Sequence, residues 1–359
     1  MNSILDIFFY FSFFIYNLIL IFFLIGFIKY LLNDKVIVNE ELKVSVVVAA
    51  KDEEKNIENL IQSLLKQTIN VEIVIVNDRS EDSTGKILDK FKNINVININ
   101  EIGKGVSPKK NALSKGIKKA NGDIILLTDA DCVVKNNWAE KMRNYYKTDI
   151  SVVSGLSFLK EYNIFHKILN LEYFLFGICT AAANSWNYPI ISTGNNFSYR
   201  KKLFNLVNGF KSILKIDSGD DDLLIQKFSN VDNVKFSFAD DSDTHVMTEP
   251  VSSFKEFVNQ RKRWGSRGLD YKPLITLMLF FVYIYFCFQM LIPVFVFFNM
   301  HLLKYFIISF IIEIFLLIVG LSKFGKLKYI IYYPVARILY IPYIVIMPFL
   351  GIVRGFKWK

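Results

Sequence analysis

The sequence has few cysteines and histidines, and it lacks the glycine-rich loops of two common nucleotide-binding motifs. Three cysteines among 359 residues, without paired spacing, exclude a disulfide-stabilised scaffold. The three histidines do not have the spacing of metal ligands. No segment matches the P-loop pattern G-x-x-x-x-G-K-[ST], which excludes the P-loop class of nucleotide-binding proteins.

The composition combines features of membrane and soluble proteins. Apolar residue types make up 52% of the chain and include 34 phenylalanines, which excludes a disordered protein and is unusual for a soluble domain. The chain also carries 43 basic and 33 acidic residues, a formal net charge of +10, which is unusual for a simple bundle of membrane helices. We therefore expect membrane segments and a soluble domain in separate parts of the chain.

Three long stretches contain almost no charge. Residues 7–28 have no charged side chain and are long enough to cross a hydrocarbon core of about 30 Å. Residues 273–303 are also uncharged, and residues 305–322 carry a single charge, Glu313. A charged residue within a membrane span is a functional candidate, although an ion pair with Lys304 is the plainer explanation.

These stretches divide the chain into four parts. We predict an N-terminal transmembrane helix, a soluble domain, two transmembrane helices and a basic C-terminal region, at residues 1–35, 36–272, 273–322 and 323–359 respectively. Lysines follow the first span, so the positive-inside rule places the N-terminus outside and the soluble domain in the cytoplasm. The excess of basic residues then reflects topology and attraction to anionic lipid, and we predict no nucleic-acid partner.

The last apolar stretch, residues 329–353, differs from the others. It contains Arg337 and three prolines, each of which removes a helical hydrogen bond. A fourth crossing would also leave the basic C-terminal tail outside, against the charge rule. We therefore predict a re-entrant or interfacial segment and a cytoplasmic C-terminus.

The soluble domain alternates strand and helix patterns. Continuous apolar runs typical of buried parallel strands occur at residues 44–50, 71–76, 94–99 and 123–128. Helical patterns follow the first run and precede the fourth, at residues 57–65 and 108–121. This alternation predicts an α/β fold with a mostly parallel sheet covered by helices, which binds its ligand at the carboxyl ends of the strands.

Acidic residues gather where these strands end. The segment after the first strand, AAKDEEKN, contains no glycine, which excludes the G-x-G-x-x-G dinucleotide site. Asp129 and Asp131 follow the fourth strand, two positions apart. An isolated pair of this kind is most often a solvated turn, but acids at the other strand ends favour a site for Mg²⁺ or Mn²⁺.

Taken together, the motifs resemble those of family 2 glycosyltransferases with the GT-A fold. They occur in that family's order across residues 42–270: VSVVVAAKDEEKNI, VNDRSEDST, GKGVSPKKNALSKGI, GDIILLTDADC, TGNNFSYRK, SGDDDLLIQKF and QRKRW. The final Q-x-x-R-W resembles the subset that contains membrane-embedded polysaccharide synthases and ceramide glucosyltransferases. The resemblance implies an integral, multi-pass enzyme, in a bacterial cytoplasmic membrane.

The resemblance also implies roles for individual residues of the donor site. Ala49, Glu53 and Asp78 would surround the nucleoside, which is expected to be uridine. Lys104, or one of Lys109 and Lys110, would contact the diphosphate. Asp129 would face ribose, sugar or metal, and Asp131 would hold the metal.

Transfer of the sugar also requires a base that takes the proton of the acceptor hydroxyl. The family's Glu-Asp motif appears here as three aspartates, and alignment of the following apolar residues makes either Asp221 or Asp220 the base. Gln260, Arg263 and Trp264 would lie near the donor diphosphate and the acceptor. Trp264 is alternatively a membrane-interface anchor.

The expected reaction is the metal-dependent, inverting transfer of a sugar from a nucleotide donor to a membrane-associated acceptor, a lipid or a glycan, of which we favour the lipid. Residues 164–191 are apolar but interrupted by charge, so they form either an amphipathic helix at a lipid entrance or a buried core helix. A processive polysaccharide synthase is the alternative function, although few spans are available to enclose a polymer channel. A non-enzymatic transporter or scaffold is a weaker one, because the acidic motifs and Q-x-x-R-W are intact.

Overall fold

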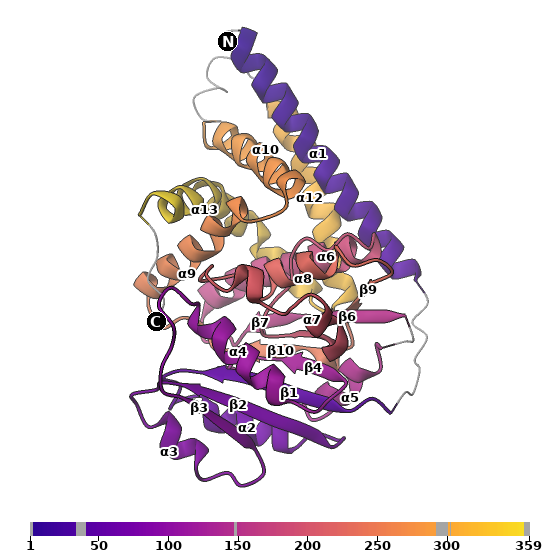
Figure 1. Ribbon diagram of the computed structural model, residues 1–359. Helices are drawn as coiled ribbons and strands as arrows, with labels where there is room; N and C mark the ends of the chain where they lie inside the picture. Colours follow the sequence, from indigo (N-terminus) through magenta and orange to yellow (C-terminus); the bar gives the residue numbers. More distant parts are fainter. Residues whose placement is uncertain (1–2, 34–40, 147–148, 292–300, 302, 355–359) are drawn as a thin grey trace.

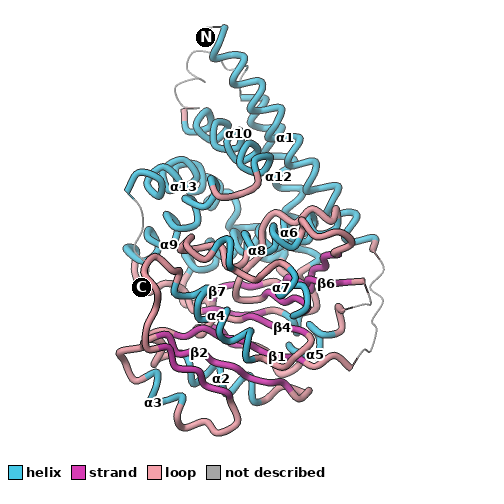
Figure 2. The backbone as a smooth tube through the Cα atoms, viewed as in Figure 1, coloured by secondary structure: helices cyan, strands magenta, loops and turns pink. Residues whose placement is uncertain are grey.

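The computed structural model describes residues 3–33, 41–146, 149–291, 301 and 303–354. An α/β domain forms one end of the molecule, and long helices extend from it at the other end (Figure 1). Figure 2 shows that the strands lie together within the α/β domain, while the extension is helical. The division into a soluble domain and apolar helices therefore appears in the arrangement of the chain.

A seven-stranded sheet forms the centre of the α/β domain, in the order β3-β2-β1-β4-β8-β6-β9. Its strands are β1 (Val44–Ala50), β2 (Val71–Asp78), β3 (Asn95–Ile99), β4 (Ile124–Leu127), β6 (Ile150–Gly155), β8 (Phe197–Arg200) and β9 (Lys235–Ala239). The first four are mutually parallel and match the predicted strands, while β8 runs antiparallel to both its neighbours. The carboxyl ends of β1, β2 and β4 consequently share one edge of the sheet.

Helices cover both faces of this sheet. On one face, α2 (Ile57–Leu65), α3 (Thr84–Leu88) and α5 (Trp138–Arg143) contribute to an apolar core with β1, β2 and β4. On the other, α4 (Pro108–Lys119), α7 (Lys201–Leu206) and α8 (Asp222–Phe228) contribute to a second core. The predicted helical face of residues 57–65 is buried as its spacing required.

A small second sheet and short 3₁₀ turns connect these layers. The sheet has the order β5-β10-β7, formed by β5 (Cys132–Val133), β10 (Val246–Thr248) and β7 (Ser157–Leu159). The turns are η1 (Lys211–Ile213), η2 (Ser242–Thr244), η3 (Arg267–Leu269) and η5 (Leu327–Tyr332). Thr248 of β10 pairs with Cys132 of β5, the residue that follows Asp131. The small sheet therefore lies next to Asp131.

Three apolar helices run side by side away from the sheet: α1 (Ser3–Leu32), α10 (Pro273–Met290) and α12 (Leu303–Lys323) (Figure 1). Each is long and apolar enough to cross a membrane. They include the predicted spans 7–28 and 305–322, and part of 273–303; residues 292–300 and 302 lie outside the described residues.

The last described helix, α13 (Tyr333–Arg354), continues through Pro342 and Pro348. With the preceding turn it forms a fourth segment, residues 327–351, that is long and apolar enough to cross a membrane. It packs extensively against α9 (Phe254–Ser266), the helix that carries Q-x-x-R-W, and also against α10. The interfacial position of this segment stays a prediction.

Residues 164–185 form the helix α6 (Ile164–Ser185), between the sheet and the apolar helices. It packs against α1, β7 and β9, and most of its residues from Leu169 onward are buried. Its first turn is apolar and exposed, with Ile164 at 64% exposure, and Leu175 is exposed farther along the helix. The buried core helix, one of the two alternatives predicted for this segment, therefore describes most of α6.

Candidate active site

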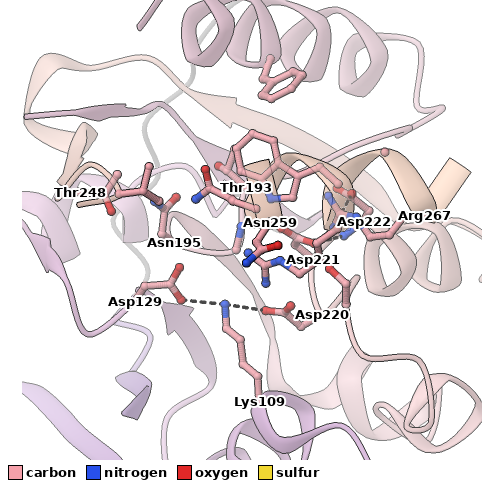
Figure 3. A pocket seen from close by; sticks show the side chains of 18 of the residues that line it. Lys109, Asp129, Thr193, Asn195, Asp220, Asp221, Asp222, Thr248, Asn259 and Arg267 are labelled. Atoms are coloured by element: carbon pink, nitrogen blue, oxygen red, sulfur yellow. Dashed lines mark hydrogen bonds and ion pairs between the residues drawn. The ribbon is translucent and has the colours of Figure 1, made fainter. Parts of the chain in front are cut away.

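One large cavity begins at the shared strand edge and extends between the apolar helices. Its volume is about 1740 Å³. The residues after β1, β2 and β4 line one end, and side chains of α10 and α13, including Leu277, Phe280 and Phe349, line the other. Aspartates 220–222 and residues of α9 lie between the two ends (Figure 3). The cavity thus connects a polar site to an apolar region.

The residues predicted to surround the nucleoside all line the polar end. Ala49, Glu53 and Asp78 belong to this lining. The Asp78 carboxylate is buried and accepts two hydrogen bonds from Arg79, at 2.8 and 3.1 Å. The Glu53 backbone N–H donates to Thr84 Oγ1 at 2.8 Å, which fixes the turn after β1. The local fold therefore supports the shape of this end of the cavity.

The three candidate lysines occupy different environments. Lys109 lines the cavity, and its Nζ lies 2.8 Å from Asp129 Oδ1 and 3.0 Å from Asp220 Oδ2 (Figure 3). Lys110 is buried beside it, with Nζ donating to the carbonyls of residues 213, 216 and 218 at 2.6–2.9 Å. Lys104 is exposed on the loop before α4. Successive residues of a helix point in different directions, which separates Lys109 from Lys110.

Asp131 lies at the centre of a group of carboxylates. Its burial, followed by repulsion from Asp129 and Glu53, raises the pKa of Asp131 to about 7. Within the described residues, no group of three Asp, Glu, His or Cys side chains is arranged to hold a metal. A cation here would take ligands from Asp131, with or without Asp129, and from a bound substrate. The carboxylate repulsion fits such a cation, because a positive charge would relieve it.

The three consecutive aspartates also differ from one another. Burial raises the pKa of Asp220, but its ion pair with Lys109 outweighs this effect and keeps the pKa below the usual value. For Asp221, burial and repulsion from Asp222 and Asp220 raise the pKa to about 7. Asp222 is held on both oxygens, by the backbone N–H of Ser192 and by the hydroxyl of Tyr271. Between the two candidate bases, Asp221 rather than Asp220 has the pKa that suits a base near neutral pH.

Residues of α9 and the following turn complete the wall of the cavity. Gln260, Arg263 and Trp264 all belong to the lining, and their predicted position near the diphosphate and the acceptor stays a prediction. Arg267, which the sequence analysis did not identify, lies 3.3 Å from Asp221 and 3.0 Å from Asp222 (Figure 3). Arg267 follows Arg263 by four residues, so both side chains lie on one helical face. This spacing is the sequence feature that could have indicated Arg267.

Other polar residues that line the cavity were not predicted as site residues, although the TGNNFSYRK motif contains two of them. They are Thr193, Asn195, Thr248 and Asn259 (Figure 3). They come from the loop before β8, from β10 and from α9, and only the packing of the two sheets brings them together. Such residues can hydrogen-bond to sugar hydroxyls.

The domain around this cavity is similar in sequence to known proteins. Residues 45–216 match the family described as Glycosyl transferase family 2. A probable glycosyltransferase of Bacillus subtilis, YdaM, is 28% identical over 263 residues, which cover 67% of this chain and 58% of YdaM. The poly-beta-1,6-N-acetyl-D-glucosamine synthase of Staphylococcus aureus is 31% identical over 152 residues, 41% of this chain and 37% of the synthase. The chain thus spans less than two thirds of the length of either relative.

A solved structure has the same fold. It is a mannosyltransferase from Pyrobaculum calidifontis in complex with GDP-Man and Mn²⁺, with a TM-score of 0.56 and 14% identity. The match covers 94% of this chain and 95% of the other. The fold is therefore of the GT-A type, as predicted from the motifs.

Proposed function

We propose that the chain is a family 2 glycosyltransferase, the family that residues 45–216 match, and that it transfers a sugar from a nucleoside diphosphate sugar to a lipid acceptor at the membrane. The observation that carries this proposal is the continuous cavity. It joins the acidic strand edge to apolar side chains of α10 and α13. A nucleotide sugar needs the polar end, and a lipid needs the apolar one.

The donor occupies the polar end in this proposal. Ala49, Glu53 and Asp78 surround the nucleoside, with uridine as the expected base, and Asp129 lies near ribose or sugar. Lys109 and Arg263 line the cavity and would face the diphosphate, and Lys109 pairs with Asp220. Lys110 is excluded from this role, because its ammonium already donates to three backbone carbonyls. Lys104 lies on an exposed loop and would contact the diphosphate from there.

A divalent cation, Mg²⁺ or Mn²⁺, completes the donor site. Asp131, with or without Asp129, would hold it together with the donor phosphates. When bound, the cation stabilises negative charge on the departing diphosphate. The raised pKa of Asp131 supports this assignment, because a cation would restore the ionised carboxylate.

Asp221 acts as the base. It takes the proton of the acceptor hydroxyl while the hydroxyl oxygen forms a bond to the anomeric carbon and the nucleoside diphosphate leaves with the electron pair. A single displacement of this kind inverts the configuration at that carbon. Asp220 is the less suitable base because its ion pair with Lys109 stabilises the charged form and weakens its basicity.

A processive polysaccharide synthase is the second candidate function. The similarity to the Staphylococcus aureus synthase favours it, although that match covers 37% of the relative. The two functions differ in product, because a single transfer yields a glycolipid and a processive enzyme yields a polymer.

Product analysis of the purified, detergent-solubilised chain tests the proposal. The chain is incubated with radiolabelled UDP-, GDP- and dTDP-sugars, a total bacterial lipid extract and Mn²⁺ or Mg²⁺. We expect label in the lipid fraction, and label only in polymer would favour the synthase. Asp131→Ala and Asp221→Ala are expected to abolish transfer, while Asp149→Ala, which removes a surface ion pair with Lys235, is the matched control. Full activity in the first two variants would disprove the site assignment.

A further inference from the structure

A buried ion pair includes the second residue of the Q-x-x-R-W motif. Arg261, 1% exposed, places Nη2 2.7 Å from Oε2 of Glu172, and the Tyr343 hydroxyl donates to the other oxygen of Glu172 at 2.9 Å. The three residues belong to α9, α6 and α13 respectively. This set, the Arg261 clamp, therefore joins three helices that are far apart in the sequence.

The clamp also contacts the aromatic side chain of the motif. The Arg261 guanidinium carbon lies 4.0 Å from the centroid of the Trp264 ring. Tyr173 and Phe176 of α6 approach the same ring edge-on, with centroids 6.2 and 5.9 Å away. Arg261 itself does not line the cavity in the described part of the chain, whereas Trp264 does. The cation therefore supports the indole from outside the cavity.

The backbones of α9 and α13 approach closely at the same level. A methyl group on Gly265 would lie 2.8 Å from Cα of Pro348, so only glycine permits this contact. A methyl group on Gly351 would collide with the carbonyl oxygen of Lys262. Trp264 is thus held on a helix whose position depends on α13.

We propose that Arg261 is a positioning residue for the acceptor, and that with Glu172 and Tyr343 it fixes the Trp264 ring as a wall of the acceptor path. This inference rests on the proposed glycosyl transfer to a lipid. The clamp couples α13, which lies outside the family motifs, to the motif residue Trp264, which lines the cavity.

The chain provides a matched control for this clamp. Arg337 of α13 forms a second Arg–Glu–Tyr cluster, with Nε 2.7 Å from Glu313 Oε2 and the Tyr333 hydroxyl 2.6 Å from the same oxygen. This cluster joins α13 to α12, and the Tyr16 hydroxyl adds α1 through a 2.8 Å bond to Glu313. It has the same chemistry but does not include Trp264.

The test compares two double variants, Arg261→Met with Glu172→Gln and Arg337→Met with Glu313→Gln. Removing both charges of a pair avoids the uncompensated buried charge that single variants would leave. Arg261→Lys serves as the conservative rescue. For each we measure the apparent KM for total lipid extract, the KM for the donor and the unfolding temperature. Acrylamide quenching of the Trp264 fluorescence, isolated by subtracting a Trp264→Phe counterpart, is a readout independent of activity.

We expect the Arg261 double variant to raise the apparent lipid KM about ten-fold, which corresponds to the loss of a desolvated cation–π contact. Quenching of Trp264 should also increase, with little change in the donor KM, and Arg261→Lys should restore part of both. The Arg337 variant should change only the unfolding temperature. Equal effects in the two double variants, or an unchanged lipid KM and unchanged quenching, would overturn the inference. If the wild type transfers no sugar to lipid, the proposed function fails, and quenching alone then decides whether Arg261 positions Trp264.

Discussion

Asp220, Asp221 and Asp222 show how neighbouring identical residues acquire different chemistry. Asp220 is paired with a lysine, Asp222 is held by hydrogen bonds on both oxygens, and Asp221 accepts hydrogen bonds from the backbone N–H groups of Gly194 and Asp222 while lying 3.3 Å from Arg267. Sequence spacing left the choice between Asp220 and Asp221 open. Their partners favour Asp221 as the proposed base.

This assignment predicts the pH dependence of the reaction. Asp221 must be ionised to accept a proton, so kcat/KM should be low below pH 6 and rise through about pH 7, the pKa to which burial and like charges raise this carboxyl. Asp221→Asn should lower kcat roughly 100- to 10,000-fold and leave donor binding intact. Transfer rates between pH 5 and 9, with donor affinity measured separately, check both statements. A pH-independent rate in the wild type would contradict them.

Lys110 is predicted to be structural. Its ammonium holds the loop at residues 213–218, directly before the aspartates. Lys110→Met should lower the free energy of unfolding by about 2 kcal/mol, because three carbonyls lose a charged donor. Denaturant unfolding measures this change, and Lys104→Met, at an exposed site, is the control. Equal stability of the two variants would show that the loop does not depend on Lys110.

At the scale of elements, α9 and α13 pack against each other, and both line the cavity that connects the acidic site to the apolar side chains. Their contact depends on glycine at close backbone approaches and on the buried partners of Glu172. Helix α6 packs against both the sheet and α1, so it links the α/β domain to the apolar helices.

The glycine contact is open to a direct test. Gly265→Ala should lower the unfolding temperature by several degrees, because the methyl group meets the backbone of Pro348 and neither helix can move independently. Gly268→Ala is the matched control, since its methyl group would meet only Leu279 Cδ1 at 3.5 Å. Thermal unfolding in detergent compares the two. A Gly265→Ala variant as stable as the Gly268→Ala variant would show that α9 and α13 are not closely packed.

At the scale of the whole molecule, the apolar helices and the catalytic domain share one cavity. The lysines that follow the first apolar helix predict that the α/β domain lies on the cytoplasmic side of a membrane. The topology depends on whether α13 crosses the membrane. This helix is long and apolar enough to cross, yet it packs along α9.

Fusions test this topology. A reporter active only outside the cytoplasmic membrane, placed after residue 359, should be inactive if residues 329–353 are interfacial, while the same reporter at the N-terminus should be active. A fluorescent protein that folds only in the cytoplasm should give the reverse result. Activity of the first reporter at the C-terminus would show that α13 crosses the membrane.

Local sequence patterns determined much of the secondary structure and the position of the acidic motifs. The first four strands, the apolar helices and the acidic strand ends follow from hydrophobic periodicity and from motifs within single segments, because each signal is contained in a short stretch of chain. Strands β6, β8 and β9 carried weaker signals; β8 even runs antiparallel to its neighbours. Only the tertiary structure decided which polar groups meet. Lys109 reaches Asp220 and Lys110 does not, and Glu172 finds Arg261 across 89 positions, because such partnerships depend on how distant helices pack.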